Sequence, residues 1–193
     1  MLKEEIRILG FDDGPFEFKQ KGKIPVIGVV FRGGKFMDGL LKTEVIIDGL
    51  DSTEKMIKLV NSSRHKNQLK LIMLDGITFG GFNLTDIKKL QKETGLPVIV
   101  VNREVPNFED VKKALKNFKD FEKRWKIVKS AGKIKTCNLR DGEKLFYQNV
   151  GISEEDAEEA IQLSCTHALY PEPLRVAHLI ATGIVKGESY GKA

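Results

Sequence analysis

Three short apolar runs in this chain end in acidic residues, and this repeat limits what the chain can fold into. The runs span residues 7–13, 45–51 and 71–76. A carboxylate just past a buried strand lies at the edge of a sheet, where several such strands bring their acidic ends together. Clustered like charges raise one another's pKa, and hard divalent cations that prefer oxygen ligands relieve the repulsion. The pattern therefore raises the hypothesis of a Mg²⁺ site for phosphate chemistry.

A length of 193 residues allows one large domain or two small ones, and the absence of repeats and of a linker favours a single domain over residues 1–193. Charged residues make up 31% of the chain and hydrophobic residues 41%, which suits a folded domain with a substantial core. No apolar run approaches the ~20 residues that span a bilayer, and the first residues lack the apolar core of a signal peptide. The two cysteines have no metal-ligand spacing. We therefore expect a cytoplasmic protein without a membrane partner.

The apolar periodicity predicts an α/β protein. Strands are expected at 6–12, 24–32 and 36–48, the third interrupted near Asp38-Gly39, and the short turns between them predict an antiparallel meander. Buried strands then alternate with amphipathic helices, which is typical of parallel pairing. The later elements are expected as a helix at 52–62, a strand at 69–75, a helix at 84–94, a strand at 97–103, a basic helix at 108–129, a hairpin of 133–139 with 143–150, an acidic helix from Ser153 and a last helix from Pro171 to about Val185.

This order is that of the ribonuclease H-like fold, a mixed sheet of three antiparallel strands followed by parallel strands with flanking helices. In that fold the first and fourth strands are neighbours, so Asp12 (or Asp13) and Asp75 would meet. Each acid taken alone also suits a turn, because Asp bonds nearby backbone N–H groups. Taken together, their positions favour a site for Mg²⁺ or Mn²⁺.

The sequence does not decide which residue would be the third metal ligand. Asp48, Asp51 and Glu54 all lie where the first predicted helix begins. Asp51 equally suits an N-cap and Glu54 a partner of the helix dipole, while Asp48 also suits an exposed strand end.

A glycine-rich loop follows Asp75 and leads into a helix. Its Gly80 and Gly81 would let backbone N–H groups approach a phosphate, although the loop also reads as an ordinary surface turn. No Gly-Lys-Ser/Thr sequence of a Walker motif is present.

Basic residues concentrate between residues 112 and 135, a segment that contains ten Lys or Arg and only two acidic residues. With a net charge of +5, this favours a nucleic-acid partner, while a merely solvated helix face is the alternative. The spacing of Phe118, Phe121 and Trp125 predicts a core stripe rather than base-stacking groups. His167 and His178 are expected to pack in helices rather than to act as ligands.

At several points the chain resembles the endonuclease V family, most closely an archaeal group related to it. Gly10-Phe11-Asp12 and Leu74-Asp75-Gly76 are similar to the family's Gly-Val-Asp and Val-Asp-Gly. The stretches 80–84, 97–101 and 171–177 resemble its glycine-rich loop, its following strand and its last helix.

The resemblance implies a ribonuclease H-like fold and Mg²⁺-dependent cleavage near deaminated purines in nucleic acid. By position, Asp12 and Asp75 would be metal ligands. The family's catalytic Glu falls on Glu54, with Asp51 a near neighbour, and Arg103 stands where the family has a lysine that would contact substrate.

Two departures from the family are clear. Gln148-Asn149-Val150-Gly151 replaces Pro-Gly-His-Arg, and Val45-Ile46-Ile47-Asp48 replaces the strand-separating Pro-Tyr-Ile-Pro.

The leading hypothesis is a metal-dependent nuclease diverged from endonuclease V. Its rivals are a nucleic-acid-binding protein that kept the fold and lost catalysis, and a small-molecule phosphate enzyme. The sequence does not decide whether the substrate is DNA or RNA, which lesion is recognised, or what the oligomeric state is.

Overall fold

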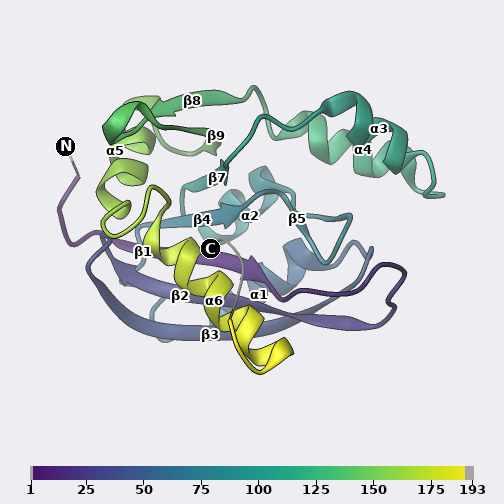
Figure 1. Cartoon of the computed structure of the whole chain (residues 1–193), viewed down its shortest axis with the longest axis horizontal. Helices are drawn as coiled ribbons and strands as arrows, with labels where there is room; N and C mark the ends of the chain where they lie inside the picture. Colours follow the sequence, from purple (N-terminus) through teal and green to yellow (C-terminus); the bar gives the residue numbers. More distant parts are fainter. Residues whose placement is uncertain (1, 190–193) are drawn as a thin grey trace.

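A seven-stranded mixed sheet, covered by helices on both faces, organises the chain (Figure 1). The computed structural model describes residues 2–189, without the side chain of Asp141. The elements are β1 (Arg7–Asp13), β2 (Lys23–Arg32), β3 (Phe36–Ile46), α1 (Ser52–Ser62), β4 (Leu71–Asp75), β5 (Thr78–Phe79), β6 (Asn83–Leu84), α2 (Ile87–Thr94), β7 (Val98–Asn102), α3 (Phe108–Leu115), α4 (Phe121–Ser130), β8 (Lys135–Asn138), the 3-10 turn η1 (Arg140–Gly142), β9 (Lys144–Val150), α5 (Glu154–Ser164) and α6 (Glu172–Lys186).

The strand order is β3-β2-β1-β4-β7-β9-β8. The first three strands form an antiparallel meander, and β1, β4 and β7 run parallel to one another. β8 and β9 form a hairpin that joins the sheet antiparallel to β7. The predicted ribonuclease H-like fold is therefore confirmed. The expected interruption of β3 is a bulge at Asp38, since Val30 pairs with Gly39 and Phe31 with Met37.

Successive side chains of β1 point to opposite faces of the sheet and pack in two different hydrophobic cores. Leu9 and Phe11 pack with the apolar faces of α1 and α2. Ile8 packs on the opposite face, with residues of α5 and α6. Helix α6 also covers β2, and it crosses in front of β1 and β2 in Figure 1. Both faces of the central strands are thus buried, as expected for parallel strands between helices.

A glycine sets how closely α6 approaches the sheet. A Cβ added to Gly10 would lie 2.6 Å from the backbone carbon and oxygen of Pro173, at the start of α6. Real Cβ atoms do not approach backbone this closely, so only glycine allows the first turn of α6 to lie directly on β1.

The single helix predicted at 108–129 is wrong, because the chain turns between Leu115 and Phe121 to form the separate helices α3 and α4. Tertiary contacts override the local helix propensity here. Arg124 of α4 is only 4% exposed and donates hydrogen bonds to the carbonyl oxygens of Asp48, Gly49 and Phe82. The apolar stripe itself packs in a core, as predicted, with the Phe82 and Phe118 ring centroids 5.7 Å apart.

Helix α2 begins later than expected. Leu84, predicted to be the first residue of this helix, instead belongs to β6, which pairs with β5. Asp86 then caps α2, because its side chain accepts hydrogen bonds from the backbone N–H groups of Lys88 and Lys89. In the part of the chain that the structure describes, no helix has the length and apolar character needed to cross a membrane.

Candidate acidic site

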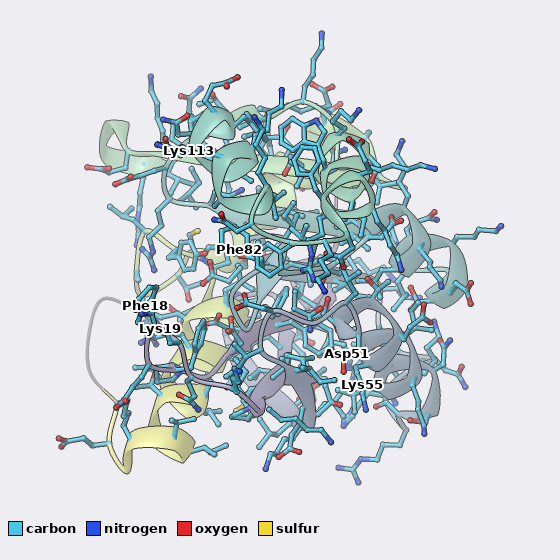
Figure 2. The ribbon with its side chains drawn as sticks, turned by 90° about the vertical axis from the view of Figure 1, so that its right-hand side faces the viewer. Phe18, Lys19, Asp51, Lys55, Phe82 and Lys113 are labelled. Atoms are coloured by element: carbon cyan, nitrogen blue, oxygen red, sulfur yellow. The ribbon has the colours of Figure 1, made fainter. Side chains whose placement is uncertain are left out.

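Two acids meet at the carboxyl end of the neighbouring strands β1 and β4. Phe11 and Leu74 are register partners in this parallel pair, and the next residue on each strand is acidic: Asp12 and Asp75. Partners in parallel strands point to the same face. Both acids therefore lie on the face covered by α6. The carboxyl ends of β1 and β4 point to the right in Figure 1, and this edge faces the viewer in Figure 2.

Each carboxylate has a fixed partner from the C-terminal part of the chain. Asp12 is 6% exposed, and its Oδ2 lies 2.8 Å from Nδ1 of His178 on α6. The Tyr170 hydroxyl donates to Asp75 Oδ1 at 2.6 Å. The guanidinium of Arg103 lies 3.7 Å from the centroid of the Tyr170 ring. These contacts fix the orientation of both carboxylates.

Burial and crowding shift the protonation of this site. Burial, followed by the Asp12 charge, raises the pKa of Asp75 to about 6, although the Tyr170 hydrogen bond opposes the shift. Burial and the Asp12 charge likewise raise the pKa of Asp13 to about 7. The hydrogen bond to Asp12 raises the pKa of His178. Negative charge is thus concentrated where water screens it poorly, which favours binding of a cation.

The chemistry of these donors fits a hard divalent ion. Mg²⁺ often binds through one or two carboxylates while keeping several waters and substrate phosphate oxygens. The pair Asp12 and Asp75 matches this kind of site, and the groups that hydrogen-bond them would orient them as ligands. Within residues 2–189, no group of three or more His, Cys, Asp or Glu side chains is arranged to hold one ion.

Asp51 and Glu54, considered as third ligands from the sequence, have other partners. Asp51 accepts hydrogen bonds from the Ile46 N–H and the Asn83 side chain, and makes no side-chain cap to α1. The Glu54 carboxylate pairs with Lys89 of α2. Among the described residues, neither carboxylate forms a metal-binding group of three with Asp12 and Asp75.

The glycine-rich loop uses two of its backbone donors within the protein. The Gly80 N–H donates to Asp13 Oδ2 at 2.8 Å, and the Phe82 N–H donates to Asp48 Oδ1 at 2.9 Å. Gly80 and Gly81 both have left-handed backbone, with φ of 61° and 80°. The loop thus holds Asp13 and Asp48 in place beside the acidic edge.

A cavity of about 200 Å³ borders the residue that follows Asp75. Its walls are mostly apolar, and Gly76, Asn102 and Gln148 contribute polar groups. Gln148 is buried and donates to the Gly132 carbonyl. No hydrogen bond joins the Asn102 side chain to the other described residues. The remaining lining residues are Ile77, Thr78, Phe82, Leu84, Pro106, Phe108, Val111 and Val128.

Sequence reasoning missed His178 and Tyr170. His178 was expected only to pack, yet its ring reaches Asp12. The one available signal is its spacing, since His178 follows the buried Leu174 by one helical turn and so faces the sheet. Tyr170 lies outside any element, and nothing local marks it as a partner of Asp75.

The strand order and the helices on both faces define a ribonuclease H-like fold, with two acids at the ends of adjacent parallel strands. The chain belongs to the Endonuclease dU family, whose model matches residues 4–185. A UPF0215 protein of Methanosarcina mazei is 53% identical over 193 residues, covering 100% of this chain and 97% of that protein.

Two solved structures share the fold of this chain. A crystal structure of an Archaeoglobus fulgidus protein has a TM-score of 0.85 and 41% identity, covering 94% of this chain and 99% of that one. Ciona intestinalis endonuclease V, in complex with a 24-mer DNA containing an inosine followed by a ribo-adenosine, has a TM-score of 0.63. It is 14% identical, with 94% of this chain and 87% of that chain covered, so it supports the fold alone.

Proposed function

We propose that this protein is a metal-dependent endonuclease that hydrolyses phosphodiester bonds in DNA containing a deaminated base. The observation that carries the proposal is the pair of oriented carboxylates, Asp12 and Asp75, on adjacent parallel strands. Membership of the Endonuclease dU family supports the reaction class.

Asp12 and Asp75 would hold one Mg²⁺ or Mn²⁺. Such an ion supplies an activated water and stabilises the charge that develops on the leaving oxygen. His178 and Tyr170 keep the carboxylates in a binding geometry through their hydrogen bonds. Arg103 is exposed beside Tyr170, where its cation can contact a phosphate of the substrate. Asp51 and Glu54 have no role in this proposal, because their partners lie elsewhere.

Nucleic acid would lie against the basic helices α3 and α4 and the turn between them. Their solvent-facing lysines suit phosphate contacts, which would make binding weaken steeply with salt. The endonuclease V of Ciona was crystallised with DNA, which supports a DNA partner for this chain as well. The exposed lysines of this surface are Lys113, Lys116, Lys119, Lys123, Lys126 and Lys129.

The damaged base would enter the cavity beside Asp75. Enzymes that act on one nucleotide often extrude its base from the stack, and a cavity of about 200 Å³ is large enough for one base. The family description, Endonuclease dU, points to deoxyuridine, the product of deoxycytidine deamination. The Asn102 amide offers both a donor and an acceptor, which suits the edge of uracil.

A cleavage assay tests this function. Matched oligonucleotides carrying one deoxyuridine, thymidine, inosine or ribouridine are incubated with Mg²⁺, Mn²⁺ or EDTA. We expect metal-dependent cuts near deoxyuridine and at least a tenfold slower reaction on thymidine, since rejecting the added methyl is worth roughly 1–3 kcal/mol. Equal cleavage of all four strands would contradict the base preference, and cleavage in EDTA would contradict the metal dependence.

A second prediction concerns how folding stability, and with it the stabilisation by a bound metal ion, depends on pH. The folded-state pKa values of Asp75, about 6, and Asp13, about 7, lie above the ordinary 3.8. Between about pH 4 and 7 the folded protein therefore binds more protons than the unfolded chain, so these groups lower stability as pH rises. The raised pKa of His178 acts in the same direction, because its contribution is present below pH 6.5 and lost as pH rises through the folded-state pKa.

An ion that binds the ionised carboxylates offsets this loss and must displace protons at low pH. We expect Mn²⁺ to raise the melting temperature more at pH 8 than at pH 5.5, with EDTA as the reference at each pH. The increment should vanish in Asp75→Asn. A Mn²⁺ effect of equal size at both pH values would contradict the assignment of the ion to these acids.

A nucleic-acid-binding protein without catalysis is the second candidate. One observation favours it: among the described side chains, the acidic pair gains no third carboxylate, His or Cys arranged to share its ion. This candidate predicts salt-sensitive binding that EDTA leaves unchanged and no products with any metal. The same cleavage assay, run with a binding measurement, separates the two candidates.

A further inference from the structure

The loop between β1 and β2 carries two phenylalanines in different surroundings. The loop spans residues 14–22 and directly follows Asp13. Phe16 is 36% exposed, and the tip of its ring lies beside the glycine-rich loop, since a Cβ added to Gly81 would lie 3.5 Å from Phe16 Cζ. Phe18, two residues later, is 90% exposed. One ring thus lies against a neighbouring loop, whereas the other projects into solvent.

The exposed ring lies at the tip of a closed turn. The Gln20 N–H donates to the Glu17 carbonyl at 3.0 Å, and the Glu17 N–H donates to Gln20 Oε1 at 2.8 Å. Phe18 and Lys19 are the two central residues of this turn. Lys19 has a φ of 66°, at a position where glycine or asparagine is usual. The turn therefore holds an aromatic and a basic residue at its tip despite the backbone preference against lysine.

The charge around the ring suits a polyanion. The Lys19 Nζ lies 5.4 Å from the centroid of the Phe18 ring. Lys21 and Lys23 follow, and Glu17 is the one acid between residues 14 and 23. An exposed ring with flanking cations is the combination that proteins use to stack on unpaired bases while neutralising the adjoining phosphates.

The tip also lies at the edge of the sheet that carries the acidic pair. Phe18 is five residues from Asp13, so their Cα atoms are at most about 18 Å apart, which spans roughly five nucleotides of a stacked strand. In Figure 2, which faces this edge, Phe18 and Lys19 appear on the left, with Lys113 of α3 above them.

We propose that Phe18 stacks on an unpaired nucleobase of the substrate strand, within about five nucleotides of the phosphate at Asp12 and Asp75, while Lys19 contacts the adjoining phosphate. This inference rests on the proposed function, because it requires a nucleic-acid substrate. It adds a second contact point on the strand, on the β1 side of the acidic pair and apart from the lysines of α3 and α4.

Binding of a fluorescent single-stranded oligonucleotide to the Asp75→Asn protein measures this contact without cleavage. We expect Phe18→Ala to weaken binding about 5- to 160-fold, the range for loss of one base–aromatic stack. Phe18→Trp should restore affinity, whereas Phe18→Leu, which is apolar but has no ring, should not. Because the ring is exposed, none of these changes should alter the melting temperature.

Phe36 provides the matched control. It is 59% exposed and begins β3, beside the turn at the opposite end of β2 from the loop. We expect Phe36→Ala to leave binding unchanged. Unchanged affinity in Phe18→Ala, or full affinity in Phe18→Leu, would overturn the stacking proposal. Absence of cleavage by the unmodified protein would instead overturn the nuclease function, and the affinity comparison would still decide the role of Phe18.

Discussion

Asp75→Asn is expected to reduce cleavage at least about a thousandfold, because a bound cation supplies several kcal/mol of transition-state stabilisation that a neutral amide cannot retain. The substitution keeps the size of the side chain, and the Asn carbonyl oxygen can still accept the Tyr170 hydrogen bond. Rates on an oligonucleotide with one deoxyuridine, at saturating Mn²⁺, give the measurement.

The same variant should fold at least as well as the unmodified protein. The pKa of Asp75 is raised to about 6, so at pH 8 its ionised form is less stable in the folded protein than in the unfolded chain. In EDTA at pH 8 we therefore expect an equal or higher melting temperature. Wild-type activity in Asp75→Asn would refute the site.

Glu54→Gln is the matched acidic control. Glu54 lies on α1 and pairs with Lys89, at an exposed position. The resemblance to endonuclease V pointed to this residue as catalytic, whereas its contacts place it on the helix surface. We expect cleavage within about twofold of the unmodified protein, since exposed ion pairs contribute little. If Glu54→Gln lost as much cleavage activity as Asp75→Asn, Glu54 would have to be assigned to the catalytic site.

Gly10→Ala is expected to lower both stability and activity. The new methyl group would lie 2.6 Å from the Pro173 backbone, so α6 must move away from β1. Overpacking of this kind is destabilising by about 1–3 kcal/mol. Because α6 carries His178, the contact to Asp12 should weaken too, with a further loss of about 10- to 100-fold in metal affinity or activity. Denaturant unfolding and Mn²⁺ titration measure the two effects.

Gly183→Ala controls for the helix itself. Gly183 lies on α6, and a Cβ at this position meets no atom within 4 Å. Replacing a helical glycine with alanine should stabilise the protein by about 0.5–1 kcal/mol and leave activity unchanged. If Gly10→Ala were as stable as Gly183→Ala, the close packing of α6 on β1 would not matter to the fold.

The local sequence pattern was sufficient to predict most of the helices and strands. The helix predicted at 52–62 matches α1, and the meander, the buried strands and the β8–β9 hairpin also agree. These elements follow from periodicity and turn residues, which act over a few positions. The long helix at 108–129 failed because Arg124 bonds carbonyls about 40 to 75 residues away, which no local pattern records.

The sequence by itself determined the sheet order and therefore the meeting of Asp12 and Asp75, because both acids directly follow strands whose neighbourhood the element order fixes. Only the tertiary structure decided which groups surround them. His178 and Tyr170 come from segments about 95 to 166 residues away, and their approach depends on how α6 rests on Gly10. Such contacts arise from packing between distant segments, whereas strand ends and helix faces are set by neighbours in the chain.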